Sequence, residues 1–311
     1  MSGIDLAWIA SVTGARRARR AARIQSLWAG YGELVRVELD DGRTAVVKWA
    51  RPPAGAQDAS ARRKRRSFDV ETAFYRSLAP RCDDACRVPA LLGARGDGDE
   101  WLLVLEDLDA AGFTGRTDEA TGPQLDRVLA WLASFHARFL GERPDGVWPT
   151  GSYWHLDTRR DELSAIDDPL LRFNAPLLAA RLTGARYQTL IHGDAKDANF
   201  CFSPTSVAAV DFQYTGAAPG IVDVAYLLYG RTDEPAHGID DARLDLYFTH
   251  LRAALPVDVD ADALEREWRA LYITARLDFC RFLAGWRPAM WAGDARGQRF
   301  VRSYLETRSQ I

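Results

Sequence analysis

The segment ELVRVELDDGRTAVVKW, residues 33–49, constrains the fold more than any other part of the chain. Apolar and polar residues alternate on both sides of an Asp-Gly dipeptide, a pattern typical of two antiparallel strands joined by a tight turn. A third short apolar run, IQSLW at residues 24–28, precedes a Gly-Tyr-Gly turn at residues 30–32. The sequence therefore predicts an antiparallel sheet near the amino terminus, with strands at residues 24–28, 33–39 and 44–49.

The pattern becomes helical further along the chain. A helix is predicted to open at Ser67 and to end before Pro80, because serine caps helices and proline cannot continue them. WLLVLEDL, residues 101–108, predicts a buried strand that runs into a polar link. From about Asp109 onward helices dominate, and apolar residues recur at helical spacing over residues 124–140.

The length of the chain predicts two domains, since 311 residues exceed what one compact core usually holds. The change from strands to helices places the boundary near residues 106–110. We therefore expect a mostly β lobe at residues 1–107 and a mostly helical lobe at residues 108–311.

The composition is that of an ordinary globular protein, with a net charge of only −3, so no nucleic-acid partner is expected. No stretch approaches the roughly 20 apolar residues that span a bilayer. The arginine-rich run at residues 16–23 lacks the wide apolar face of a membrane-surface helix, and it follows the apolar part of the amino terminus, the reverse of a secretory signal. We expect a cytoplasmic protein without a membrane partner, with its four cysteines as free thiols.

The stretch LIHGDAKDANFCF, residues 190–202, gathers the residues most suited to chemistry. The run NFCF at its end, the turn SPTS and the run VAAVDF predict a tight hairpin, which is expected to bring Asp194, Asn199 and Asp211 to one edge, where two carboxylates and an amide oxygen suit Mg²⁺. The alternative is an ordinary loop in which Asp194 and Asn199 only cap turns.

The pattern HGDAKDAN, followed twelve residues later by Asp-Phe, resembles the catalytic loop and metal-binding element of the protein-kinase-like fold. His-Gly-Asp and Asp-Phe-Gln are similar to the small-molecule kinases related to choline kinase and aminoglycoside phosphotransferases, especially the ecdysteroid-kinase-like group. The resemblance extends over most of the chain. It implies an α+β, bilobal protein-kinase-like fold with a small antiparallel-sheet amino-terminal lobe and a larger helical carboxy-terminal lobe.

The resemblance also implies a role for each residue of the loop. Asp194 matches the catalytic aspartate that accepts or orients the proton of the attacking hydroxyl, and Lys196 matches a lysine that meets the γ-phosphate. Asn199 and Asp211 are implied to hold Mg²⁺ between the β- and γ-phosphates of ATP. His192 is implied to brace the loop.

Two charges occur where an apolar core is expected. Lys48 lies within an apolar strand, and Glu71 shares a helical stripe with Phe74 and Leu78. Either charge alone is equally well explained by an edge position where the side chain reaches water. The resemblance implies that the two form an ion pair and that Lys48 contacts the α- and β-phosphates.

Two further nucleotide contacts are implied by the resemblance. Gly30 and Gly32 allow close backbone approach to phosphate, although Val35 stands where G-x-G-x-x-G has its third glycine, so this turn alone is weak evidence. Backbone groups of Glu106 and Leu108 are implied to contact adenine.

The short connection after Asp211 disfavours a protein substrate. Only eleven residues separate Asp211 from Asp223, too few for the activation segment on which protein kinases bind peptides. Gly193 replaces the arginine that would bind a phosphorylated activation loop, which implies a kinase without that switch. Asp223 is implied to support the catalytic loop, and it could also cap the helix that follows.

Three other features have more than one explanation. Phe282, Trp286 and Trp291 lie where the family's acceptor pocket is expected, and core packing explains them about as well. The basic run at residues 62–66 is interpreted as a solvated surface loop, and ordering around the nucleotide is the alternative. His136 falls on an apolar stripe and is interpreted as a core histidine.

The sequence as a whole predicts an ATP- and Mg²⁺-dependent phosphotransferase that moves the γ-phosphoryl group to a hydroxyl of a small-molecule alcohol, as a monomer or dimer. The acceptor itself does not follow from the sequence. A protein serine/threonine kinase is an alternative that Lys196 favours. A nucleotide-binding pseudokinase is a second alternative, against which the intact set of charged residues argues.

Overall fold

The structure, a computed structural model, describes residues 3–27, 30–53, 55, 57–96, 99–231 and 241–306. The chain forms two compact units that are each discontinuous in sequence. The first unit comprises Met1–Asp118, Asp145–Val147 and Ala198–Gln213, and the second comprises Glu119–Pro144, Trp148–Asp197 and Tyr214–Ile311.

The first unit is built on a five-stranded antiparallel sheet with strand order β1-β2-β3-β5-β4. Its strands are β1 (Ala18–Ser26), β2 (Gly32–Leu39), β3 (Thr44–Ala50), β4 (Leu91–Gly96) and β5 (Trp101–Glu106). The tight turn expected at the Asp-Gly dipeptide joins β2 to β3, where Gly42 has a φ of 86° and its N–H donates to Leu39 O. This sheet and the helical remainder of the described chain confirm the predicted α+β class.

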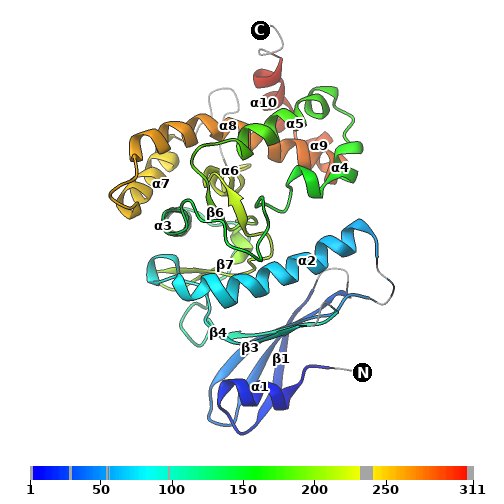
Figure 1. Cartoon of the computed structure of the whole chain (residues 1–311), viewed down its shortest axis with the longest axis vertical. Helices are drawn as coiled ribbons and strands as arrows, with labels where there is room; N and C mark the ends of the chain where they lie inside the picture. The colour runs from blue at the N-terminus through cyan, green and yellow to red at the C-terminus, as the bar shows by residue number, and fades with distance from the viewer. Residues whose placement is uncertain are drawn as a thin grey trace. The chain divides into compact units, whose positions relative to one another are not determined.

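Two helices cover the two faces of this sheet (Figure 1). Alternate residues of β3 point to opposite faces, as a strand requires. Val47 packs with Ile9 of α1 (Leu6–Thr13) on one face. Ala50, on the other face, packs with Phe68 of α2 (Ala59–Ala73), and Lys48 points to this same face.

The arginine-rich run after α1 forms most of β1, which begins at Ala18, well before the predicted strand at residues 24–28. Charged pairing across the strands explains the difference, because Arg19 pairs with Glu38 and Arg20 with Glu33 of β2. Trp28, the last residue of the predicted strand, lies outside the described residues.

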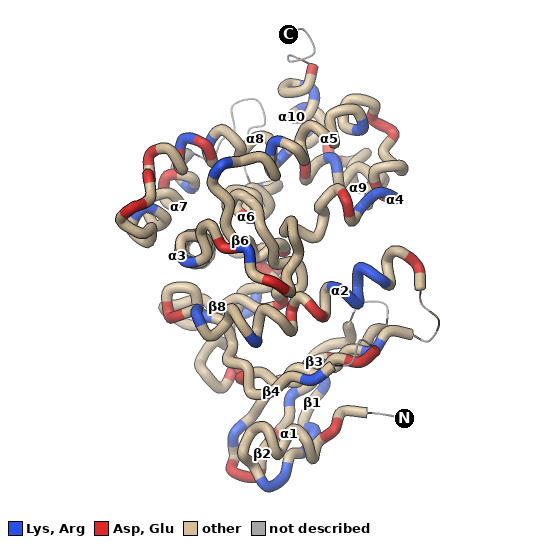
Figure 2. Tube along the Cα trace, in the orientation of Figure 1, with Lys and Arg blue, Asp and Glu red and all other residues tan. Residues whose placement is uncertain are grey.

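Helix α2 begins much earlier than predicted, so the assignment of its start to Ser67 is wrong. The cap is Asp58, whose carboxylate accepts from Ala61 N at 2.7 Å. The basic residues 62–66 therefore lie on the helix and not on a loop, and Figure 2 shows basic positions along the first part of α2. After α2 the chain continues as a wide helical turn, η2 (Phe74–Leu78), and a 3-10 turn, η3 (Ala79–Arg81).

The first unit also includes the hairpin of β7 (Phe200–Phe202) and β8 (Val207–Ala209), which was predicted after the loop at residues 190–202. Ala209 N donates to Arg87 O, next to the 3-10 turn η4 (Asp84–Cys86), and Cys201 packs with Leu108. The first compact unit thus includes residues 198–213, which the predicted boundary had placed in the second lobe. The boundary after residue 107 stays a prediction.

The second unit is mainly helical among its described residues. Its longer helices are α3 (Pro123–Arg138), α5 (Pro169–Thr183), α6 (Ile221–Leu227), α7 (Asp241–Ala254), α8 (Ala261–Trp286) and α10 (Ala295–Leu305). Short turns of helix are η5 (Leu156–Thr158), α4 (Arg160–Ser164) and α9 (Pro288–Gly293). Helix α3 confirms the predicted helix at residues 124–140.

In the second unit, the stretch that resembles a kinase catalytic loop begins in a two-stranded ribbon. Strand β6 (Thr189–Ile191) pairs antiparallel with β9 (Gly216–Ala218). The loop after β6 ends in the 3-10 turn η6 (Asp197–Asn199). Within the described ranges, no helix has the length and hydrophobicity required to cross a membrane, and no disulfide joins the cysteines.

Candidate active site

The first unit brings three of the predicted site residues together around one ammonium group. Lys48 Nζ lies 2.7 Å from a Glu71 carboxylate oxygen and 2.8 Å from Asp211 Oδ1. The Glu71 side chain is only 2% exposed, whereas that of Asp211 is 34% exposed. Asp211 is therefore the member of this set that a ligand reaches most easily.

The two carboxylates of this cluster stabilise the charged form of Lys48. Burial alone would lower the pKa of Lys48, but the carboxylates of Asp211 and Glu71 outweigh it and raise that pKa above its ordinary value. Burial also raises the pKa of Glu71, although Lys48 acts in the opposite direction. The ammonium is thus held in its charged form, as contact with phosphate oxygens requires.

The residues around Asp211 hold it in an unusual backbone conformation. Its φ is 70°, in the left-handed region, where a non-glycine residue costs of order 1–3 kcal/mol. Val210 N donates to Asn199 O at 2.9 Å, and the Phe212 ring stacks on Phe74 with 3.7 Å between centroids. Contacts on both sides therefore fix the backbone that presents Asp211.

Asn199 and Asp211 carry the kinds of oxygen donor that suit Mg²⁺, and their role as its ligands stays a prediction. A carboxylate and an amide oxygen fit this ion, which protein sites often hold through one or two side chains and the phosphates of the substrate. The described residues contain no group of three or more His, Cys, Asp or Glu side chains that could hold a metal ion by themselves. This donor set therefore suits an ion that is shared with a nucleotide.

The glycine turn has a clear steric requirement at one position. Gly32 has a φ of 144°, and a Cβ there would lie 2.0 Å from Trp49 O, so only glycine fits beside β3. Gly30 has a φ of 74° with open space around it. The structure thus explains Gly32 by strand packing, and a phosphate contact for either glycine stays a prediction.

Two backbone groups of the link after β5 are already hydrogen-bonded within the first unit. Glu106 N donates to Ala90 O at 2.9 Å, and Leu108 O accepts from Phe113 N at 2.8 Å. Any contact of these two residues with adenine is therefore expected to use Glu106 O and Leu108 N. The Glu106 side chain is itself paired with Arg87 at 2.5 Å.

In the second unit, Asp194 lies between a cation and a phenol. Lys196 Nζ contacts Asp194 Oδ2 at 2.8 Å, and Tyr226 OH donates to Asp194 Oδ1 at 3.5 Å. Burial raises the pKa of Tyr226, and the Asp194 carboxylate raises it further, so the phenol keeps its proton. Each oxygen of the Asp194 carboxylate thus has a polar partner.

Asp223 holds the backbone of this loop. Its Oδ2 accepts from His192 N at 2.7 Å and its Oδ1 from Gly193 N at 3.0 Å. His192 Nδ1 in turn accepts from Asp194 N at 3.3 Å. Asp223 is the third residue of α6, and its oxygens bind these loop amides, which is the contact that the predicted support role requires.

His136 extends this support into the core. Its Nε2 lies 3.2 Å from Asp223 Oδ2, and its Nδ1 lies 2.8 Å from Tyr247 OH. The sequence interpretation of a core histidine therefore holds, but it missed the link from α3 to the loop. No local signal marks it, because the partners are 87 and 111 residues away in sequence.

The close packing around residue 193 explains why it is a glycine. It has a φ of 81°, and a Cβ would lie 2.1 Å from Tyr214 O. No other side chain fits there without moving the backbone, so the arginine of protein kinases is sterically excluded at this position.

A Gly193→Ala substitution is therefore expected to destabilise the second unit strongly. A left-handed alanine costs about 1–2 kcal/mol, and the clash with Tyr214 O adds about 1–3 kcal/mol. Gly230→Ala is the matched control, because Gly230 has a φ of 77° but nothing within 4 Å of the added Cβ. Urea unfolding of both variants measures the difference, and equal losses would contradict this account.

The aromatic residues predicted near the acceptor divide into two groups. Phe282, fully buried, stacks with Trp286 at 5.2 Å and meets Tyr153 edge-on at 5.2 Å. Tyr153 lies 5.7 Å from the ring of Tyr226, which contacts Asp194. A continuous aromatic wall therefore leads from Asp194 to Trp286, which is 37% exposed. Trp291 lies on α9 and is buried.

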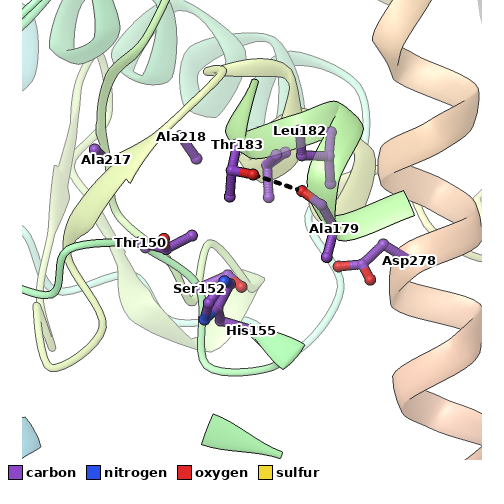
Figure 3. A pocket seen from close by; sticks show the side chains of 11 residues that line it. Thr150, Ser152, His155, Ala179, Leu182, Thr183, Ala217, Ala218 and Asp278 are labelled. Atoms are coloured by element: carbon purple, nitrogen blue, oxygen red, sulfur yellow. Dashed lines mark hydrogen bonds between the residues drawn. The ribbon is translucent and has the colours of Figure 1, made fainter. Parts of the chain in front are cut away.

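One pocket of the second unit lies between the loop at residues 150–155, α5, β9 and α8 (Figure 3). Burial lowers the pKa of His155 at its edge and so favours the neutral imidazole. None of the predicted site residues lines the pocket.

A comparison with known families identifies the class of protein. Residues 23–257 match the profile described as the phosphotransferase enzyme family, APH. The chain belongs to this family. It is thus an ATP-dependent phosphotransferase that acts on a hydroxyl of a small molecule, as the sequence predicted. The narrower ecdysteroid-kinase-like assignment stays a prediction.

Solved structures of other kinases share the fold of this phosphotransferase. An amicoumacin kinase, hAmiN, in complex with AMP-PNP, Ca²⁺ and Ami is 15% identical, with 90% of this chain and 88% of that chain covered and a TM-score of 0.59. A choline kinase from Cryptosporidium parvum Iowa II is 10% identical, with 94% and 90% covered and a TM-score of 0.58. A microcompartment-associated aminopropanol kinase is 15% identical, with 93% of each chain covered and a TM-score of 0.53. A comparison of this phosphotransferase with curated proteins found no match.

Proposed function

We propose that this phosphotransferase moves the γ-phosphoryl group of Mg²⁺-bound ATP to the hydroxyl of a small alcohol. The observation that carries the proposal is the Lys48 ammonium held at 2.7 and 2.8 Å between Glu71 and Asp211. A buried charge of this kind is costly unless it is paired, and its pairing leaves Asp211 partly exposed.

The predicted site residues of the first unit bind the nucleotide. Lys48 binds the α- and β-phosphates, and Glu71 keeps it in position. Asn199 and Asp211 would hold Mg²⁺, which would supply positive charge to neutralise the phosphates of the nucleotide. Glu106 O and Leu108 N bind adenine.

The residues of the second unit act on the acceptor. Asp194 orients the acceptor hydroxyl and takes its proton as the new oxygen–phosphorus bond forms and the bond from the γ-phosphorus to the ADP oxygen breaks. Lys196 moves from Asp194 to the transferring phosphoryl group, where its charge stabilises the developing negative charge. His192 and Asp223 keep the loop in place through its backbone.

The acceptor is expected to rest against the aromatic wall of Tyr226, Tyr153, Phe282 and Trp286. Arg159 lies over this wall, 5.2 Å from the centre of the Phe282 ring, and its side chain is paired with Glu162. The related kinases named for choline and aminopropanol support a small hydroxylated amine as a first candidate class.

The proposal is tested by measuring ADP release with a panel of alcohols and amino alcohols, using Asp194→Asn as the background. For the best acceptor, Trp286→Ala is expected to lower kcat/KM for the acceptor roughly tenfold and to leave the KM for ATP unchanged, because truncated contact aromatics often cost more than 1 kcal/mol. Phe173→Ala, another exposed aromatic of this unit at 77%, serves as the control. A panel without activity above background would refute the proposed reaction for these acceptor classes.

A further inference from the structure

Gln213 joins the Asp-Phe element to helix α2. Its amide Nε2 donates to Glu71 Oε2 at 3.3 Å, and its Oε1 lies 3.5 Å from Ser67 Oγ. Ser67 precedes Glu71 by one helical turn, and neither residue is more than 1% exposed. One side chain of the first unit thus contacts two buried polar groups on the same face of α2.

The contacts of Gln213 with Ser67 and with Glu71 differ in strength. The Ser67 hydroxyl has one proton, and it donates this proton to Lys64 O at 2.8 Å, so its contact with Gln213 is the weaker one. The amide N–H to the Glu71 carboxylate is a charge-assisted bond in a buried place, where such bonds are strong. The important partner of Gln213 is therefore Glu71.

The chemistry of this position favours an amide over its alternatives. Lys48 already approaches both oxygens of Glu71, and the Gln213 N–H adds a further donor to one of them. A glutamate at position 213 would place a second carboxylate against Glu71. A glycine, as in Asp-Phe-Gly, would remove the donor entirely.

Each of the three residues of the Asp-Phe-Gln element contacts another residue of the first unit. Asp211 binds Lys48, Phe212 stacks on Phe74, and Gln213 binds Glu71. The left-handed backbone of Asp211 needs such support, because strained residues persist only where their neighbours determine them.

We propose that Gln213 is a positioning residue that fixes Glu71 and, through Glu71, Lys48, so that the nucleotide-binding cluster is assembled before the nucleotide arrives. The inference rests on the proposed function, since it assumes that this cluster binds nucleotide phosphates. Its proposed effect on the nucleotide runs through Glu71, to which its amide donates.

The test is the affinity for ADP with Mg²⁺, measured by calorimetry without any acceptor. Gln213→Glu is expected to weaken binding about tenfold, because the two carboxylates repel each other and Lys48 is drawn from its place. Gln213→Leu, which fills the same space without the hydrogen bond, is expected to weaken binding severalfold. The KM for ATP rises in both variants, while the KM for the acceptor does not change.

A swapped pair separates positioning from simple packing. In Glu71→Gln/Gln213→Glu the amide and carboxylate exchange places, so their hydrogen bond is restored and ADP binding is expected to be no weaker than in Glu71→Gln alone. Losses that instead add up in the double variant would overturn the inference. Thermal unfolding without ligand checks that each variant is folded.

Gln188→Glu is the matched control. Gln188 is 7% exposed, as is Gln213, but its amide donates to Leu182 O and Ala185 O in the second unit. If Gln188→Glu loses as much ADP affinity as Gln213→Glu, or if Gln213→Glu binds ADP as the wild type does, the inference is overturned and the proposed function still stands. A wild-type protein that fails to bind ADP would overturn the proposed function, and this inference with it.

Discussion

Asp194→Asn is expected to lower kcat by roughly 10²- to 10⁴-fold, the usual contribution of a positioned general base. Asparagine keeps the size of the side chain but cannot take the proton of the acceptor hydroxyl, and it removes the ion pair with Lys196. ADP affinity is expected to stay near the wild-type value, because Lys48, Glu71 and Asp211 belong to the first unit. Steady-state kinetics and ADP calorimetry measure the two effects separately.

The control for this variant is Asp168→Asn in the same unit. Asp168 caps α5 by accepting from Leu170 N and Leu171 N, and asparagine caps helices about as well as aspartate. Its activity is therefore expected to match that of the wild type. Asp194→Asn activity above a tenth of wild type would refute the assignment of Asp194 as the base.

Lys48→Met is expected to reduce both stability and nucleotide binding. Removing one partner of a buried ion pair costs about 3–5 kcal/mol, because Glu71 is left as a charge without its counterion. Loss of a charge-assisted contact to phosphate weakens ADP binding by about 1.5–3 kcal/mol, or roughly ten- to a hundredfold. Urea unfolding and ADP calorimetry check these two losses.

Lys48→Met/Glu71→Leu tests whether the stability loss comes from the orphaned carboxylate. Replacing both charges by apolar groups of similar size is often neutral, so most of the stability is expected to return. Nucleotide binding is expected to remain weak, since the ammonium is still missing. A double variant as unstable as Lys48→Met would show that another interaction of Lys48 dominates.

The parts of the fold that the sequence predicts well are those with strong local signals. The hairpin of β2 and β3 follows from alternation around an Asp-Gly turn, and α3 follows from its apolar spacing. Lys48 and Glu71 were recognisable because each is a charge inside an apolar pattern. Such conflicts between a residue and its local pattern are often functional.

The parts that the sequence does not predict depend on partners far along the chain. The start of α2 was assigned to Ser67, since a polar cap before apolar residues is the usual signal. The actual cap, Asp58, precedes a basic stretch without apolar periodicity, in which residues 63–66 are only half-buried. The roles of Gln213 and Tyr226 depend on contacts with distant residues. Gln213 contacts Glu71, 142 residues away, and Tyr226 contacts Asp194, 32 residues away.

The two edges of the five-stranded sheet differ in how they resist self-association. The edge strand β4 is contacted by Arg76 of η2, which donates to Ala94 O, whereas in the described part of the chain β1 pairs with β2 alone and leaves most of its side chains exposed. An exposed edge is a template for another chain unless charge discourages it, and the arginines of β1 supply that charge. Electrostatic repulsion is screened over about 10 Å at 0.1 M salt, so this edge is best protected against aggregation at low ionic strength.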